Sequence, residues 1–283
     1  MMLKGKQLWF LDKFGRMLPD GIFLRWKYRL LIGKKLHLKH PALYNEKLQY
    51  MKLHDRNPLY TILADKASVK SYVASRVGQE YVIPTLGVWK TVSEIDFESL
   101  PDSFVLKCTH DSGSTVLCRN KDDFDKHAVC QKLGNALSKN YYFNDREWVY
   151  KNIRPAVIAE KYMGGDIADY KFFCFDGKPM IMFIATDRSD PAKETKFDFF
   201  DMDFNHIPVR NGHPNAALPP EKPSSWEDMK KLASRLSHGL PHVRVDLYEI
   251  DGRLYFGEYT FYHWGGFVPF EPEDLNIRMG TWM

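Results

Sequence analysis

The sequence predicts an α+β protein in which two adjoining β-rich lobes follow a helical N-terminal region. Apolar residues recur at helical spacing up to Gly78, which stands where a helix would end. Short runs rich in β-branched and aromatic residues follow at 81–90, 104–109 and 114–119. The second half is more strongly β and contains an alternating run at 243–261.

We expect three parts: a helical region over residues 1–60, a first lobe over 61–155 and a second lobe over 156–283. Residues 22–39 alternate bulky apolar and basic side chains, which predicts an amphipathic helix interrupted at Gly33. A basic helix packed on the body of the protein is the favoured interpretation. Contact with a membrane surface or an acidic partner is the alternative.

Composition excludes several classes of protein. The 283 residues include 40 basic and 36 acidic side chains, so the net charge of +4 is too small to indicate nucleic-acid binding. The four cysteines lack the paired spacing of a zinc site or a disulfide scaffold. The first residues show neither a signal peptide nor a membrane span. We therefore expect a cytoplasmic protein with reduced thiols and no nucleic-acid partner.

Lys107 interrupts the apolar run 104–109, just before the small polar loop at 110–114. A lysine in a strand can face solvent at the edge of a sheet. Alternatively, an ammonium group beside a Gly/Ser turn with free backbone N–H groups suits a phosphate chain. The loop lacks the residue order of a Walker phosphate loop, so these residues alone leave both interpretations open.

Asp251-Gly252 lies between two alternating runs and predicts a β-hairpin. A two-residue loop would place Asp246 and Glu258 on opposite faces, whereas a three-residue loop would place them on the same face. We predict the three-residue loop. Two carboxylates on one face would repel each other without a cation, and oxygen ligands favour Mg²⁺. The alternative is one carboxylate in and one out, with Asp246 paired to Arg244.

A third candidate site lies at 157–175, where an apolar strand ends near Glu160 and a Gly-Gly turn leads to Asp169 and Lys171. Exposed backbone at such a crossing can bind an adenine edge, and an acidic residue beyond it can hold ribose hydroxyls. An ordinary β-turn explains the same residues equally well.

Taken in order, these motifs resemble the ATP-grasp superfamily. The stretches LPDSFVLKCTHDSGS, REWVYKNIRPAVIAEKY, DYKFFCFDGKP and FGEYTFYHWGGF resemble the TupA-like ATP-grasp proteins, whose genes commonly accompany capsule and exopolysaccharide genes of bacteria. The resemblance extends from about Leu24 to the end of the chain. It implies an ATP-grasp fold, in which ATP lies between two lobes.

The resemblance implies an ATP site with assigned residues. The phosphates would contact Lys107, Ser112, Gly113 and Ser114, and the adenine hinge would consist of Glu160, Lys161 and Met163. The ribose would be held by Asp166 or Asp169. Lys66 would be a further nucleotide lysine, with a charged helix surface as its alternative role.

The resemblance also implies a metal site and catalytic residues. Asp246 and Glu258 would bind Mg²⁺, Arg244 would face the transferring phosphoryl group, and Lys171 and Arg188 are weaker candidates for contacts to phosphate or substrate. Three departures concern Thr260, where many ATP-grasp enzymes have an asparagine metal ligand, Asp111, where glycine is more usual, and His263-Trp264, where Pro-Gly often stands. An acid beside phosphates is unfavourable unless it faces away or assists the metal.

The implied function is an ATP-dependent carboxylate–amine ligase. It would make an acylphosphate and attach an amino acid to a sugar acid or to another amino acid during capsule or exopolysaccharide synthesis. One alternative is a sugar kinase on the same fold, with His110, His263 or Asp111 as the base. The others are a glycosyltransferase, suggested by Asp-Met-Asp at 201–203, and a non-catalytic nucleotide-binding module.

Overall fold

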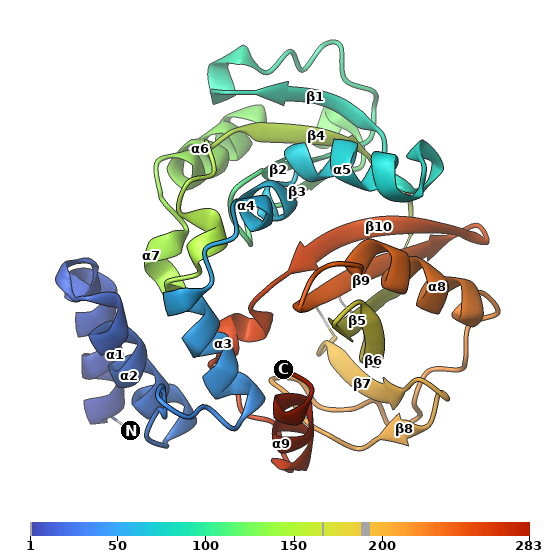
Figure 1. Ribbon diagram of the computed structural model, residues 1–283. Helices are drawn as coiled ribbons and strands as arrows, with labels where there is room; N and C mark the ends of the chain where they lie inside the picture. The colour runs from blue at the N-terminus through green and yellow to red at the C-terminus, as the bar shows by residue number, and fades with distance from the viewer. Residues whose placement is uncertain (1, 166, 188–192) are drawn as a thin grey trace.

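The computed structural model describes residues 2–165, 167–187 and 193–283 and contains two antiparallel sheets (Figure 1). Asp166 and Arg188 lie outside the described residues. The first sheet has the order β1 (Thr85–Trp89), β4 (Val157–Lys161), β2 (Phe104–Cys108), β3 (Val116–Cys118). The second has the order β10 (Arg253–Thr260), β9 (His242–Ile250), β5 (Asp169–Phe175), β6 (Lys178–Thr186), β7 (Lys196–Asp201), β8 (His206–Ile207).

Helices precede, connect and cover the sheets (Figure 1). The α-helices are α1 (Met2–Phe14), α2 (Asp20–Ile32), α3 (Tyr44–His54), α4 (Pro58–Ala64), α5 (Ser68–Val77), α6 (Lys126–Leu137), α7 (Tyr142–Asp145), α8 (Trp226–Ser237) and α9 (Asp274–Thr281). Short 3₁₀ turns include η2 (Gln79–Tyr81), η5 (Trp148–Tyr150) and η6 (His263–Gly266). Within the described chain, every helix is too short or too polar to cross a bilayer. The predicted α+β class with two β-rich lobes is confirmed.

The boundary between the lobes differs from the expected one. β4 pairs with β1 and β2, so it belongs to the first sheet, and the chain enters the second sheet only at β5. The lobes therefore change over between Lys161 and Asp169 rather than at residues 155–156. The sequence did not reveal this lobe boundary, because β4 is as apolar as the strands that follow it.

The basic segment 22–39 is helical only as far as Ile32, and Gly33 ends the helix in the left-handed conformation with φ of 83°. Phe23, Leu24 and Tyr28 are buried in a cluster of their own with Phe267 of the second lobe. The favoured interpretation, a basic helix packed on the body of the protein, is confirmed for this helix.

The first sheet has one face in an apolar core, whereas the second has buried apolar side chains on both faces, as Phe172 and Phe173 show. In the first sheet, Phe104 and Leu106 pack toward Leu133 of α6. In the second sheet, Phe172 faces α8, where its ring centroid lies 5.5 Å from that of Trp226. Side chains alternate along a strand, so Lys107 of β2 and Lys171 of β5 project from the opposite faces. β2 pairs with β3 only as far as Leu106, but the Lys107 side chain is 18% exposed and ion-paired with Glu160, so the solvent-facing interpretation of Lys107 is wrong.

The predicted hairpin is present, but the predicted three-residue loop is wrong. Arg253 pairs with Ile250, which leaves a two-residue loop at Asp251 and Gly252 with φ of 51° and 71°. Positive φ at both positions is typical of the tight turn that Asp-Gly favours.

A β-bulge at Gly257 restores the common face that the turn alone would have prevented. Phe256 lies opposite Leu247 and Glu258 opposite Asp246, so Gly257 is an extra residue in β10. A Cβ atom at Gly257 would lie 2.9 Å from Cε2 of Tyr248. Glycine therefore allows the close strand approach that brings Asp246 and Glu258 together.

Candidate functional site

The centre of the second lobe is a buried charge network around Asp246, whose side chain is fully buried. The Nε and Nη2 atoms of Arg244 donate to the two carboxylate oxygens of Asp246, at 2.7 Å each. Lys171 on the neighbouring strand also donates to Asp246 and forms a 2.6 Å ion pair with Asp169. The alternative pairing of Asp246 with Arg244 is therefore present, but Glu258 shares their face.

Electrostatics keep this network ionised. Burial alone would raise the pKa of Asp246, but Arg244 and Lys171 outweigh burial and hold that pKa below its usual value. Burial alone would lower the pKa of Arg244, and Asp246 raises it instead. Removing either partner would leave an uncompensated buried charge.

His263 and Asn211 fix the position of Arg244. Arg244 can only donate hydrogen bonds, so Nδ1 of His263, 2.7 Å from Nη1, must accept. Nε2 of His263 therefore carries the proton and donates to Oδ1 of Asn211 at 2.7 Å. Burial lowers the pKa of His263 well below its usual value, and Arg244 adds to this effect. Both ring nitrogens are thus engaged, so His263 is a poor candidate for the base of a sugar kinase.

Glu258 and Thr260 form the more open side of the hairpin. The Glu258 side chain is 44% exposed, and its Oε1 lies 3.5 Å from Nη2 of Arg244. The same Nη2 atom donates to the Thr260 hydroxyl at 2.8 Å.

Whether these residues suit Mg²⁺ can be judged from their present contacts. Asp246 already accepts from two cations, whereas the Glu258 carboxylate is open to the pocket. Mg²⁺ commonly takes one or two protein carboxylates and completes its ligands with phosphates and water. The donor set therefore fits an ion held by Glu258 and a phosphorylated ligand, with Asp246 facing it. Among the described residues no group of three or more His, Cys, Asp or Glu side chains forms a metal cluster by itself.

The first lobe carries a cluster of lysines around Glu160. Nζ of Lys107 lies 2.6 Å from Oε2 of Glu160, and Nζ of Lys70 lies 2.7 Å from Oε1. Burial would raise the pKa of Glu160, but the two lysines hold it below its usual value. Sequence reasoning missed Lys70. Its place four residues after Lys66 in the sequence was the available signal.

Lys66 closes this cluster beside the polar loop. Its ammonium donates to the backbone carbonyl of Asp111, and its backbone N–H donates to the carbonyl of Thr109 at 3.1 Å. Burial lowers the pKa of Lys66, while Glu258 of the other lobe is the strongest of the charges that favour its ionised form. The charged-helix-surface interpretation of Lys66 is therefore wrong.

The polar loop turns the Asp111 carboxylate inward. Oδ1 of Asp111 accepts from the Ser114 hydroxyl at 2.6 Å, and that hydroxyl accepts from the Cys108 N–H at 2.8 Å. Asp111 thus faces the loop itself, which removes the conflict with a phosphate ligand, and the Ser114 hydroxyl holds the loop closed. Ser112 and Gly113 are the exposed tip.

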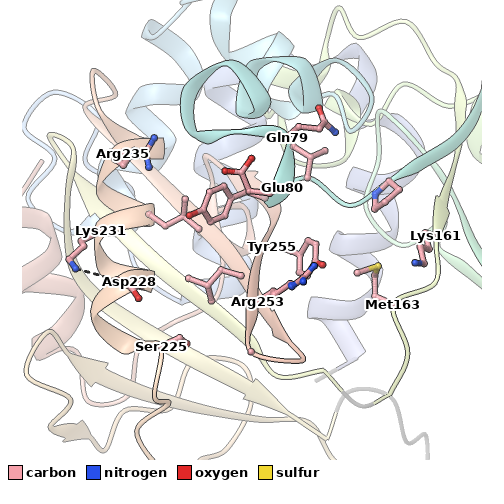
Figure 2. Close-up of a pocket in the computed structure, with 16 residues that line it drawn as sticks. Gln79, Glu80, Lys161, Met163, Ser225, Asp228, Lys231, Arg235, Arg253 and Tyr255 are labelled. Atoms are coloured by element: carbon pink, nitrogen blue, oxygen red, sulfur yellow. Dashed lines mark hydrogen bonds and ion pairs between the residues drawn. The ribbon is translucent and has the colours of Figure 1, made fainter.

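Only some of the residues predicted to bind adenine and ribose lie together. Lys161 and Met163 line a pocket of about 770 Å³, which Figure 2 shows between this segment, the tip of the β9–β10 hairpin and α8. Glu160 points instead to the lysines of the first lobe. Asp169 is 1% exposed and ion-paired with Lys171, so it is unsuited to holding a ribose.

The charged network of the second lobe lines a smaller pocket, which the tip of the polar loop also borders. It has a volume of about 330 Å³ and is lined by Ser112 of the first lobe and by Lys171, Arg244, Glu258 and Thr260 of the second. The larger pocket contains none of these residues. We therefore place the candidate chemistry in the smaller pocket, because phosphate and metal ligands require these charges.

Two antiparallel lobes, one with a lysine cluster beside a polar loop and the other with an acidic hairpin, are typical of the ATP-grasp class. The sequence model of the TupA-like ATP-grasp family matches residues 46–283, and the chain belongs to this family. The N-terminal helices α1 and α2 precede the matched region. None of the curated proteins searched matches the chain.

Solved structures of ATP-grasp ligases are similar in fold. An L-amino acid ligase from Bacillus licheniformis has 11% identity and a TM-score of 0.48 over 86% of this chain and 55% of its own. D-alanine–D-alanine ligase from Bacillus anthracis, complexed with ATP, has 17% identity and a TM-score of 0.43 over 71% of this chain and 55% of its own. The chain thus spans little more than half the length of these proteins.

Proposed function

We propose that the protein is an ATP-dependent carboxylate–amine ligase that acts through an acylphosphate. The observation that carries this proposal is the pocket that joins the tip of the polar loop, Ser112, to Arg244 and Glu258 of the hairpin. ATP-grasp family membership and the solved ligases of this fold support the same reaction class.

The nucleotide would lie between the lobes. Lys66, Lys70 and Lys107 outnumber their one carboxylate, Glu160, so they offer positive charge to a phosphate chain. Exposed backbone N–H groups at Ser112 and Gly113 would cover the phosphates. The adenine would lie at the Lys161 side, next to Met163. A ribose contact to Asp166 or a phosphate contact to Arg188 falls outside the described residues.

Arg244 would stabilise the charge that develops when the γ-phosphoryl group passes to the substrate carboxylate. Its side chain is held by Asp246, His263 and Thr260, so it needs little rearrangement during the reaction. Glu258 would hold Mg²⁺ together with the phosphates and with Asp246 opposite. When bound, the ion would neutralise phosphate charge. Aromatic walls around Arg244 would exclude water from the acylphosphate.

The substrates we propose follow from the family resemblance: an amino acid supplies the amine, and a sugar acid or another amino acid supplies the carboxylate, in the cytoplasm during capsule or exopolysaccharide synthesis. Peripheral membrane contact through segment 22–39 is a further proposal. The apolar face of α2 is already buried, so such contact would use its exposed basic side chains, Arg25 and Arg29 among them.

Two observations weigh against the rival functions. His110 is 2% exposed and its Nε2 lies 3.0 Å from the carbonyl of Lys139, so His110 is poorly placed to act as the base of a sugar kinase. Oδ1 of Asp201 accepts the backbone N–H groups of Asp203 and Asn205 at 3.0 and 2.8 Å. This acidic pair therefore forms a turn, which argues against a glycosyltransferase metal motif.

Product analysis tests the proposal. The protein would be incubated with Mg-ATP, a panel of uronic acids and amino acids as carboxylates, and amino acids as amines, while ADP release is followed. Release of ADP and phosphate with formation of an amide is the expected result. A phosphosugar formed with ADP would show a kinase and contradict the ligase assignment.

A further inference from the structure

The pocket that contains Arg244 also has an aromatic lining. It includes the side chains of Tyr141, Tyr150, Phe197, Tyr262 and Trp264. Two acids, Asp145 and Glu147, lie among them. An aromatic wall with a few acidic groups suits an apolar body that carries a cation.

Glu147 is a buried carboxyl group that lacks a partner. The residue is 7% exposed, and no other described residue donates a hydrogen bond to its carboxylate or forms an ion pair with it. Burial raises the pKa of Glu147 to about 8, with the more distant Lys52 the main opposing influence. Burying an unpaired carboxyl group is costly, and such groups concentrate at functional sites.

The neighbouring acid is already neutralised. Asp145 forms an ion pair with Lys27 of α2. Lys52 is also engaged, because it donates to the backbone carbonyl of Gly265 at 2.6 Å and to Oε1 of Gln49 at 3.1 Å. Of the two acids among the aromatic side chains, Glu147 is therefore the one whose charge remains to be matched by a ligand.

Trp264 is presented to the same pocket by a strained turn. Its φ of 52° and ψ of 28° lie in the left-handed region, which is unfavourable for a bulky residue, and its side chain is 42% exposed. Lys52 and Gln49, both buried on α3, donate to the carbonyl of the next residue, Gly265. Strain that is held in place by buried polar groups commonly marks a binding site.

We propose that Glu147 and Trp264 form the acceptor subsite, which binds the primary ammonium group of the amine substrate. The ammonium would pair with the Glu147 carboxylate, and the apolar part beside it would lie against Trp264. This proposal rests on the proposed ligase function, because that reaction requires an amine next to the acylphosphate at Arg244.

The contact between Glu147 and the ammonium group would also promote formation of the C–N bond. Glu147 takes one proton from the ammonium group, which frees the nitrogen lone pair to form the C–N bond with the acyl carbon. The C–O bond to phosphate breaks, and its electron pair leaves with the phosphate. The second nitrogen proton passes to that phosphate, and Glu147 returns its own proton to solvent.

Binding of n-butylammonium tests the subsite without any knowledge of the true substrates, and n-butanol is its uncharged counterpart of equal chain length. The readout is the indole NMR signal that disappears in Trp264→Phe. We expect n-butylammonium to shift this signal at millimolar concentration, and Glu147→Gln to weaken its binding about tenfold or more. Glu98→Gln, at an exposed site in the first lobe, should leave binding unchanged.

Two results would overturn the subsite: equal n-butylammonium affinity in the wild type and Glu147→Gln, or n-butanol binding as tightly as n-butylammonium. The melting temperature of Glu147→Gln checks folding, and it should not fall, because an unpaired buried acid is removed. Stabilisation by Mg-ATP is measured separately in both proteins. Loss of that stabilisation would count against the nucleotide site, whereas its persistence without ammonium binding would count against the subsite alone.

Discussion

The two lobes of the cleft differ in their charge balance. The first lobe gathers three lysines, Lys66, Lys70 and Lys107, around one carboxylate, Glu160. The second lobe sets two cations, Arg244 and Lys171, among three carboxylates, Asp169, Asp246 and Glu258. The first lobe therefore has an excess of positive charge, and the second a slight excess of negative charge.

This difference in charge balance indicates that the first lobe is suited to bind a charged ligand, whereas the charges of the second lobe mainly stabilise one another. Burial lowers the pKa values of Lys66 and Lys70, so these side chains lack enough counter-charge in the protein alone. In the second lobe, Asp246 holds a lowered pKa and Arg244 a raised one, so each ion is compensated by the other. An anionic ligand would balance the excess positive charge of the first lobe. In the second lobe the charges already balance one another, except at the half-exposed Glu258.

Breaking the compensated network should have the largest effect. Arg244→Met leaves Asp246 buried with only Lys171 as its partner, and we expect the free energy of unfolding to fall by about 3–5 kcal/mol. Urea denaturation measures this. Lys107→Met is the matched control in the first lobe. It should cost less than about 1 kcal/mol, because Glu160 keeps Lys70 and the Lys107 side chain, 18% exposed, is nearer to solvent than Arg244. Equal losses in the two variants would contradict the comparison.

The uncompensated carboxyl group of Glu147 should appear in the pH dependence of stability. Its pKa is raised from 4.5 to about 8 in the folded protein, so the folded state keeps a proton that the unfolded chain has released. Stability should therefore fall as pH rises through this window.

His242 has the opposite sign, because burial lowers its pKa to about 4 and makes stability rise from pH 4 to 6.5. From pH 6.5 to 8 His242 no longer contributes, and Lys52, whose pKa is lowered to about 8, acts with the opposite sign only near the upper end. The comparison with Glu147→Gln therefore reports Glu147, and we expect a loss of up to about 2 kcal/mol that is absent in this variant. Identical urea denaturation profiles for the two proteins across this range would be inconsistent with the raised pKa.

Removing the open carboxylate of the second lobe should affect metal use and leave the fold intact. Glu258→Gln should change the free energy of unfolding by no more than about 0.5 kcal/mol, because the side chain is half-exposed. We expect the Mg²⁺ concentration needed for nucleotide binding to rise about tenfold. Titration of Mg²⁺ at fixed ATP concentration, followed by calorimetry, measures this. An unchanged Mg²⁺ requirement would exclude Glu258 as a ligand.

The sequence predicted the two lobes and the hairpin turn at Asp251-Gly252, because alternation and turn chemistry are local properties. It predicted the wrong loop length, and the residues alone left the role of Lys107 open. It correctly predicted that Asp246 and Glu258 share a face, but it attributed this to a three-residue loop. The cause is the bulge at Gly257, which the turn residues do not indicate. Lys70 was overlooked because only the assembled cleft places α5 beside β4.

The subsite residues were harder to find from the sequence. The buried state of Glu147 depends on contacts between segments far apart in the chain, and Asn211 becomes informative only through its bond to His263. The order of motifs was more informative than any one motif, because it reflects the family and the single residues do not. It still misassigned Asp169, whose neighbour Lys171 pairs with it inside the sheet.

Thermal stabilisation by Mg-ATP is the most direct test of the central claim that the lysine cluster of the first lobe binds the nucleotide phosphates. A ligand at free concentration L that binds only the folded state stabilises it by RT ln(1 + L/Kd), so the melting temperature rises with ligand concentration above Kd. Wild-type protein should melt at a higher temperature in millimolar Mg-ATP, and Lys107→Ala should lose most of that increase. Absence of stabilisation in the wild type, or an equal increase in Lys107→Ala, would contradict the account.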